Sequence, residues 1–214
     1  MKKVLIAASV ISFIEWFNRD NIAYLLDLGC EVHIACNTEY MEDTDALRTR
    51  QYLEELKQKG VILHHFAFAR SPFRFSNIKA YKELKKLIKT ERFCAVHCHT
   101  PTVSILTRLA AASSRKQGTK VVYTAHGYHF FKGAPLKNWI AFYPIERFCS
   151  RFTDVLITIN EEDYKCAKRF CRNKKVRVEY VPGVGIDTAY FKGVELEEGE
   201  REYIRKRMRE GLGV

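Results

Sequence analysis

Two apolar, strand-like runs end in histidines, and this placement suits acid–base chemistry or hydrogen bonding to a ligand. His97 and His99 lie at the end of one run, and His126 follows the next run. Imidazole is the side chain whose ordinary pKa lies nearest neutral pH. Gly127 follows His126, and glycine permits a sharp turn or a close backbone approach to a ligand. The alternative is a plain turn in which His126 is merely hydrogen-bonded.

The triplet His97-Cys98-His99 also invites a metal-site interpretation, because alternate residues of a strand share a face. No second ligand cluster at zinc-like spacing supports it, so we expect no metal. Within a strand His97 would usually pack against a neighbour, which leaves His99 and His126 as the better candidates. The seven cysteines are scattered without a CxxC pair. Such free thiols indicate a reducing, intracellular setting.

The scaffold that would position these histidines alternates short apolar strands with helices. The predicted strands cover residues 3–8, 31–36, 61–67, 93–98, 120–124, 154–159 and 176–181. The predicted helices cover residues 18–28, 45–59, 77–90, 102–116, 137–152 and 161–171. This alternation is typical of an α/β protein with a Rossmann-like, doubly wound parallel sheet. Ligands of such sheets bind outside the carboxyl ends of the strands, where the histidines would lie.

The other strand ends carry weaker signals. Residues 9–17 are expected to form a loop at the same edge. They lack the G-x-G-x-x-G fingerprint, and no Walker A sequence occurs, which argues against a nicotinamide cofactor and ordinary nucleotide hydrolysis. Asn160 is expected to cap a helix whose N-terminus favours anions, although the carboxylates that follow it oppose a phosphate there.

The charge balance points to an anionic partner, since 36 Lys and Arg against 25 Asp and Glu give a net charge of +11. One face of the predicted helix 77–90 carries Lys79, Lys82, Lys85, Lys86 and Lys89. Such a face is often only solvated. With Arg74 and Phe75 just before it, this face could also bind an anionic membrane, at about 1 kcal/mol per cation. The aromatic residues fall mostly at core-like positions, so we expect no nucleic acid.

The two ends of the chain read differently from its middle. Residues 1–14 imitate a signal peptide, but a first buried strand explains them better. No run approaches the ~18 apolar residues of a transmembrane helix. Residues 182–214 contain turn formers and a charged stretch that cannot build a core. We therefore expect one domain over residues 1–181, with 182–214 as an interdomain linker and the start of a C-terminal domain that is missing.

Several motifs in order resemble the N-terminal half of bacterial GT-B glycosyltransferases of family 4, of the capsular and exopolysaccharide type. They are VHCHTP at 96–101, YTAHGYHFFKGAP at 123–135, TDVLITINEEDY at 153–164 and VPGVGID…F at 181–191. The resemblance covers residues 2–191, nearly the whole chain. It implies a retaining sugar transfer from a nucleotide sugar, expected to be a UDP-sugar, without a cofactor or an essential metal.

The resemblance also implies roles for residues. In this family the N-terminal domain mostly binds the acceptor, and the histidine after the fifth strand, matched here by His126, approaches the transferred sugar. His126 is thus the expected catalytic residue. The expected substrate-binding residues are Ser12, Phe13, Glu15, His99, Thr100, Gly127, Tyr128 and Asn160. Where the family often has paired glycines, this chain has Ser12-Phe13-Ile14-Glu15, which points to a bulky or lipid-linked acceptor.

Two functions of different classes follow. The first is the acceptor-binding half of a glycosyltransferase that acts on a polyprenyl-linked saccharide in cell-surface polysaccharide synthesis. This half would be inactive without its C-terminal domain and would work in the cytoplasm, peripheral to the inner face of the plasma membrane. The second is a non-catalytic module that binds a sugar or a lipid phosphate.

Overall fold

The computed structural model describes residues 1–40, 46–69, 74–172, 175–183, 185, 202 and 206. The chain divides into two compact units, Met1–Gly183 and Val184–Val214. All of the strands and helices named below belong to the first unit. The segment 182–214, predicted as a linker, lies almost entirely outside the described residues.

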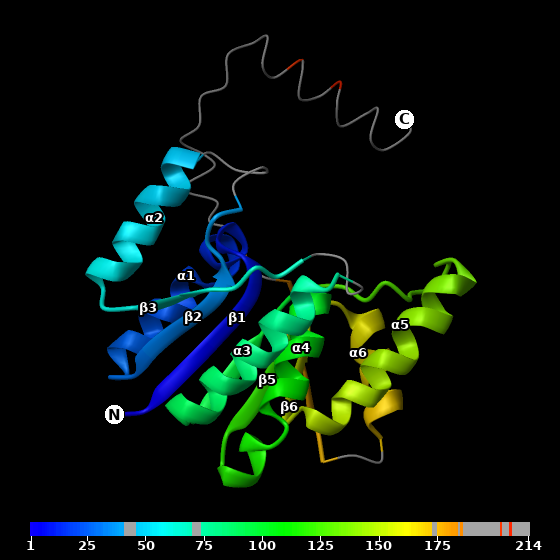
Figure 1. Cartoon of the computed structure of the whole chain (residues 1–214). Coiled ribbons are helices and arrows are strands. Elements are labelled where there is room, and N and C mark those ends of the chain that lie inside the picture. The colour runs from blue at the N-terminus through cyan, green and yellow to red at the C-terminus, as the bar shows by residue number, and fades with distance from the viewer. Residues whose placement is uncertain are drawn as a thin grey trace. The chain divides into compact units, whose positions relative to one another are not determined.

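A single sheet of seven parallel strands forms the centre of the first unit, in the order β3-β2-β1-β4-β5-β6-β7 (Figure 1). The strands are β1 (Lys3–Val10), β2 (Glu31–Asn37), β3 (Ile62–His65), β4 (Ala95–Cys98), β5 (Lys120–Ala125), β6 (Val155–Thr158) and β7 (Arg177–Tyr180). The strand order reverses between β1 and β4, which is the switch point of a doubly wound sheet. The predicted α/β, Rossmann-like class is confirmed.

Helices cover both faces of the sheet. They are α1 (Ile11–Asp27), α2 (Ala46–Gln58), α3 (Ser76–Glu91), α4 (Pro101–Ala111), α5 (Leu136–Cys149) and α6 (Glu161–Cys171), with short 3₁₀ turns η1 (Ser114–Gln117) and η2 (Ser150–Phe152). Because side chains alternate along a strand, Leu5 of β1 joins one core and Ile6 the other. The core of Leu5 includes residues of α3, α4 and α6, and that of Ile6 includes residues of α1 and α2.

The predicted loop over residues 9–17 is wrong. β1 continues to Val10 and α1 begins at Ile11, so the chain passes from strand to helix without a loop. The pairing register of β1 with β2 shifts between Ala7 and Val10, which marks the point where the strand leaves the regular ladder. Ile11 and Ile14 are fully buried. Their i, i+3 spacing is a helical signal that the preceding apolar strand conceals.

The start of α3 also differs from the prediction. The sequence offers either Asn77 or Ser76 as the cap of this helix, but the N-cap position is Phe75 and it makes no side-chain cap bond. The Asn77 side chain instead accepts a hydrogen bond from the Ala69 backbone amide at 3.0 Å. The helical spacing of Ile78 with Tyr81, Leu84 and Ile88 predicts that Ile78 is buried, but its side chain is 54 % exposed. The buried residues of this helix are Asn77, Ala80, Leu84 and Ile88.

The lysine face of α3 is exposed as predicted, at Lys79, Lys82, Lys85, Lys86 and Lys89. Among the described residues, no helix is long and apolar enough to span a bilayer. The carboxyl ends of β1, β4 and β5 lie side by side in the sheet. At this edge α1 and α4 begin, and the segment after β5 leaves the sheet, so the candidate residues of the three strand ends meet there.

Candidate active site

Three histidines meet at the carboxyl ends of β4 and β5. The ring centres of His97 and His99 are 4.1 Å apart, and those of His99 and His126 are 5.3 Å apart. Nδ1 of His99 lies 3.1 Å from Nε2 of His126. His97 Nε2 lies 2.8 Å from the Thr124 hydroxyl of β5. One ring of the His99–His126 pair must donate and the other accept, so the two imidazoles fix each other's tautomers.

All three imidazoles are held neutral. Burial, with a smaller contribution from the nearby His126, lowers the pKa of His97 to about 4. Burial also lowers the pKa of His126 to about 4. The pKa of His99 lies well below its ordinary value because the ring is buried, with His97 and His126 adding to the effect. At neutral pH such a group is a weak base, so the cluster is suited to hydrogen bonding more than to proton abstraction.

Two phenylalanines of α1 form an apolar wall against this cluster. The Phe13 ring lies 5.6 Å from that of His99 and 4.9 Å from that of His126, edge to face with the latter. The Phe17 ring lies 5.2 Å from His126. Residues four apart lie on the same side of a helix, so the direct start of α1 at Ile11 is what brings both rings to His126.

The backbone beside the histidines takes unusual conformations. Gly127 has a φ of 127° and Thr100 a φ of 56°, and a positive φ is uncommon for a β-branched residue. Within the described part of the chain, His99 Nε2 and Thr100 Oγ1 are buried without a hydrogen-bond partner. An unpaired buried polar atom costs about 1–3 kcal/mol. A ligand with polar groups at this point would offset that cost. Ser12 is buried in the first turn of α1.

Two other predicted site residues hold the segment after β5. The Tyr128 side chain is buried in the core, where its ring stacks on Phe130 at 4.7 Å. Its backbone amide donates to Asp163 Oδ2 at 3.0 Å. Asn160 is the N-cap of α6, as predicted, and its Oδ1 accepts from the Asp163 amide at 2.8 Å. Asp163 was not among the predicted site residues. Its position three residues after a capping asparagine could have identified it as part of the helix cap.

Glu15, also predicted to bind substrate, forms ion pairs with two arginines. It is 7 % exposed and accepts hydrogen bonds from Arg48 Nε at 2.9 Å and from Arg19 Nη2 at 3.4 Å. Arg19 also binds Glu55 at 2.9 Å. The structure thus gives Glu15 a place in an ion-pair network between α1 and α2.

A buried ion pair joins α4 to α5, and it was not predicted from the sequence. Arg108 Nη1 and Nη2 lie 2.9 and 3.2 Å from the Glu146 carboxylate oxygens. Arg108 also donates to Ser104, and its guanidinium lies 4.2 Å from the centre of the Tyr123 ring. The two partners are 38 residues apart in the chain, and no local pattern joins them.

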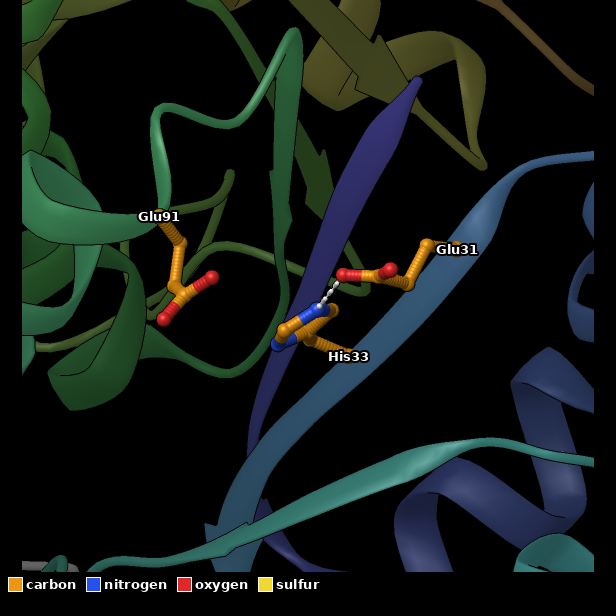
Figure 2. A group of neighbouring side chains, drawn as sticks. All are labelled: Glu31, His33 and Glu91. Atoms are coloured by element: carbon orange, nitrogen blue, oxygen red, sulfur yellow. Dashed lines mark hydrogen bonds and ion pairs between the residues drawn. The ribbon is translucent and has the colours of Figure 1, made fainter. Parts of the chain in front are cut away.

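A possible group of metal ligands lies at the opposite edge of the sheet. Glu31 and His33 of β2 and Glu91 of α3 point toward one another (Figure 2). The Lys3 ammonium, however, binds Glu91 at 2.6 Å and Glu31 at 3.2 Å. His33 Nε2 contacts Glu31 at 2.8 Å, and its Nδ1 contacts His64. A cation of the chain itself is therefore already paired with both carboxylates.

Two curated proteins match this chain, and both are named as sugar transferases. The chain is 40 % identical over 204 residues to EpsD of Bacillus subtilis (strain 168), a protein named as a glycosyltransferase, with 94 % of this chain and 48 % of EpsD covered. It is 28 % identical over 116 residues to an Escherichia coli protein named UDP-Gal:alpha-D-GlcNAc-diphosphoundecaprenol alpha-1,3-galactosyltransferase. That match covers 54 % of this chain and 29 % of the relative. The chain thus spans about half or less of these relatives' lengths.

Among solved structures, the UDP co-structure of MnaA from S. aureus superposes with a TM-score of 0.60 at 13 % identity, covering 95 % of this chain and 51 % of MnaA. At that identity the likeness shows the fold, which is one half of a GT-B architecture. The sequence model of glycosyltransferase family 4 matches residues 14–190, most of the chain. The fold, the ordered strand-end motifs and this match agree that the chain belongs to glycosyltransferase family 4.

Proposed function

We propose that the chain is the acceptor-binding half of a glycosyltransferase that moves a sugar from a UDP-sugar to a polyprenyl-diphosphate-linked saccharide. The transfer retains the anomeric configuration and serves cell-surface polysaccharide synthesis. The chain alone is inactive, because the nucleotide needs a second domain. One observation carries this proposal: a neutral His99–His126 pair, walled by phenylalanines, at the switch edge of the sheet.

His126 has the geometry of a hydrogen-bonding partner for the transferred sugar. Its Nε2 is engaged by His99, which leaves Nδ1 as the ring nitrogen for a ligand. Since its pKa is lowered to about 4 by burial, the ring carries no charge at neutral pH and can hold a sugar hydroxyl without attracting the donor diphosphate. Gly127, with its positive φ, allows the backbone to pass close to the same sugar.

The acceptor side of this site is apolar in part. Phe13 and Phe17 present ring surface next to His126, and aromatic rings pack well on the apolar faces of sugars. His99 Nε2 and Thr100 Oγ1 supply two buried polar atoms that a hydroxyl group would satisfy. The site therefore combines a stacking wall with hydrogen-bonding atoms, as a saccharide acceptor requires.

The relatives support the substrate classes. The Escherichia coli relative is named for a UDP-sugar donor and a diphosphoundecaprenol-linked acceptor, and MnaA was solved with UDP. EpsD, at 40 % identity, is named as a glycosyltransferase. A lipid-linked acceptor would place the enzyme at the inner face of the plasma membrane, and the net charge of +11 suits an anionic surface.

The test is sugar transfer from a radiolabelled UDP-sugar to undecaprenyl-diphosphate-linked saccharides, by a protein that joins this chain to a nucleotide-binding C-terminal domain. His126→Ala should lower kcat about 10²-fold, as expected for loss of one transition-state hydrogen bond in a dry site. The matched control is His129→Ala, which removes an exposed histidine from the same segment and should leave the rate unchanged.

Three results would contradict the proposal. Equal rates for His126→Ala and wild type would remove His126 from the reaction. Transfer by the 214-residue chain without a second domain would show that the chain needs no partner domain. Binding of the saccharide by the chain, with no transfer by the two-domain protein, would favour the non-catalytic module instead.

A further inference from the structure

The outer surface of α5 is unusually apolar. Leu136, Ile140, Pro144 and Phe148 follow one another at intervals of four residues, which places them in one row along the helix. All four are exposed, Leu136 to 73 % and Ile140 to 68 %. The next row adds the exposed residues Lys137, Ala141 and Ile145. The buried residues of the helix are Glu146 and Cys149.

The charges on this segment have one sign. Residues 126–152 contain a single carboxylate, Glu146, and it is buried against Arg108. The exposed charged side chains of the segment are Lys132, Lys137, Arg147 and Arg151. Glu162 and Asp163, in the first turn of α6, accept hydrogen bonds from the backbone amides of Lys132 and Tyr128, near the beginning of this segment. An apolar row flanked by cations without acids is the composition of helices that lie in a membrane interface.

The lysine face of α3 is the competing surface. It carries five lysines and two exposed apolar residues, Phe75 at 87 % and Ile78 at 54 %. Both apolar residues lie at the beginning of α3, and the helix also bears exposed Glu83. α4 lies between α3 and α5 (Figure 1). Of the two helices, α5 has the longer apolar row, since its 14 residues (about 21 Å) carry exposed apolar side chains from end to end.

We infer that the surface of α5 formed by Leu136, Ile140, Pro144 and Phe148 is a membrane-contact surface, with anionic lipid as its partner. The apolar row enters the headgroup region of the bilayer, and Lys137, Arg147 and Arg151 meet the lipid phosphates. This inference uses the proposed lipid-linked acceptor only in choosing a membrane as the occupant. Its test needs no sugar substrate, so it can fail while the proposed function holds, and the reverse.

The test is flotation of the 214-residue chain with vesicles of phosphatidylcholine alone or mixed equally with phosphatidylglycerol. Wild-type protein should bind the anionic vesicles more tightly, by about fivefold for each cation at the surface. Leu136→Ser/Ile140→Ser should weaken binding to anionic vesicles at least tenfold, because two apolar side chains no longer leave water. The matched control, Phe75→Ser/Ile78→Ser, removes two exposed apolar side chains from α3 and should stay within about threefold of wild type.

The outcomes separate the alternatives. An unfolding midpoint unchanged in both variants shows that neither has lost its fold. Equal binding to neutral and anionic vesicles, or a larger loss in the α3 variant than in the α5 variant, would overturn the inference. So would a wild-type dimer in light scattering that becomes monomeric in the α5 variant, because the surface would then be an interface between copies of the chain.

Discussion

The ion pair of Arg108 and Glu146 leads to a specific prediction about stability. The two residues are 1 % and 5 % exposed, and their bidentate contact joins α4 to α5. Glu146→Gln keeps the shape of the side chain but leaves the guanidinium buried without a counter-charge. Breaking a buried pair from one side costs about 3–5 kcal/mol, against a total of roughly 5–15 kcal/mol for a domain.

The surroundings narrow this range. Burial is the largest single influence on Arg108 and lowers its pKa, but the Glu146 carboxylate, with Tyr123 and Cys149 adding to it, holds the pKa above its ordinary value. Arginine does not release its proton in proteins, so the cation cannot escape its cost by neutralising. The hydrogen bonds to Ser104 and the cation–π contact with the Tyr123 ring remain in the variant and stabilise the cation in part. We therefore expect a loss of about 3–4 kcal/mol, in the lower half of the range.

Urea unfolding followed by circular dichroism measures this loss, and the thermal midpoint should fall by about 6–16 °C. The matched control is Glu54→Gln on α2, which breaks an exposed pair with Lys57 and should cost less than about 0.5 kcal/mol. Arg108→Met/Glu146→Leu should regain most of the stability, because it removes both charges together. A Glu146→Gln protein within about 1 kcal/mol of wild type, or a double variant as unstable as the single one, would refute the reasoning.

Three further predictions concern other parts of the fold. The pKa of His97 falls from 6.5 to about 4 on folding, so the unfolded chain takes up a proton at a higher pH than the folded chain does. This one group should lower the free energy of unfolding by about 2 kcal/mol between pH 7 and pH 5. His97→Gln should reduce this loss of stability in acid, as measured by urea unfolding. Asp163→Ala should cost about 2 kcal/mol by leaving the buried Tyr128 amide unpaired, seen as faster hydrogen exchange of that amide. Calorimetric titration with Zn²⁺ should show tighter binding by Lys3→Met than by wild type, because the variant frees the Glu91 and Glu31 carboxylates from their ion pairs with Lys3.

Much of the fold follows from local patterns. The seven apolar runs could be predicted as strands because a parallel strand buried on both faces needs a continuous apolar sequence. The alternation of strands with helices then leaves few topologies other than a parallel sheet. The cap at Asn160 could be predicted because a cap is decided by a few adjacent residues. The gathering of His97, His99 and His126 was expected in outline, since the carboxyl ends of neighbouring parallel strands meet at one edge of the sheet.

Contacts made between distant segments could not be predicted in the same way. Arg108 and Glu146 look like ordinary surface charges of two helices, and only the packing of α4 against α5 buries them. Ile78 looked like a core residue by spacing, but α3 is oriented so that Asn77 and Ala80 are buried instead. The Glu15 carboxylate likewise pairs with Arg19 of its own helix and with Arg48 of α2. A single sequence carries no signal for such long-range choices.

The error at residues 9–17 matters most, because the start of α1 decides which chemistry His126 can perform. In an open loop, Phe13 and Phe17 would leave the imidazole in water, with a pKa near 6.5 and the properties of a general base. The direct passage from β1 into α1 instead packs both rings against it, and burial lowers its pKa to about 4. The absence of a first loop thus turns a titrating histidine into a neutral hydrogen-bonding group, which is the form that can hold a sugar beside a diphosphate.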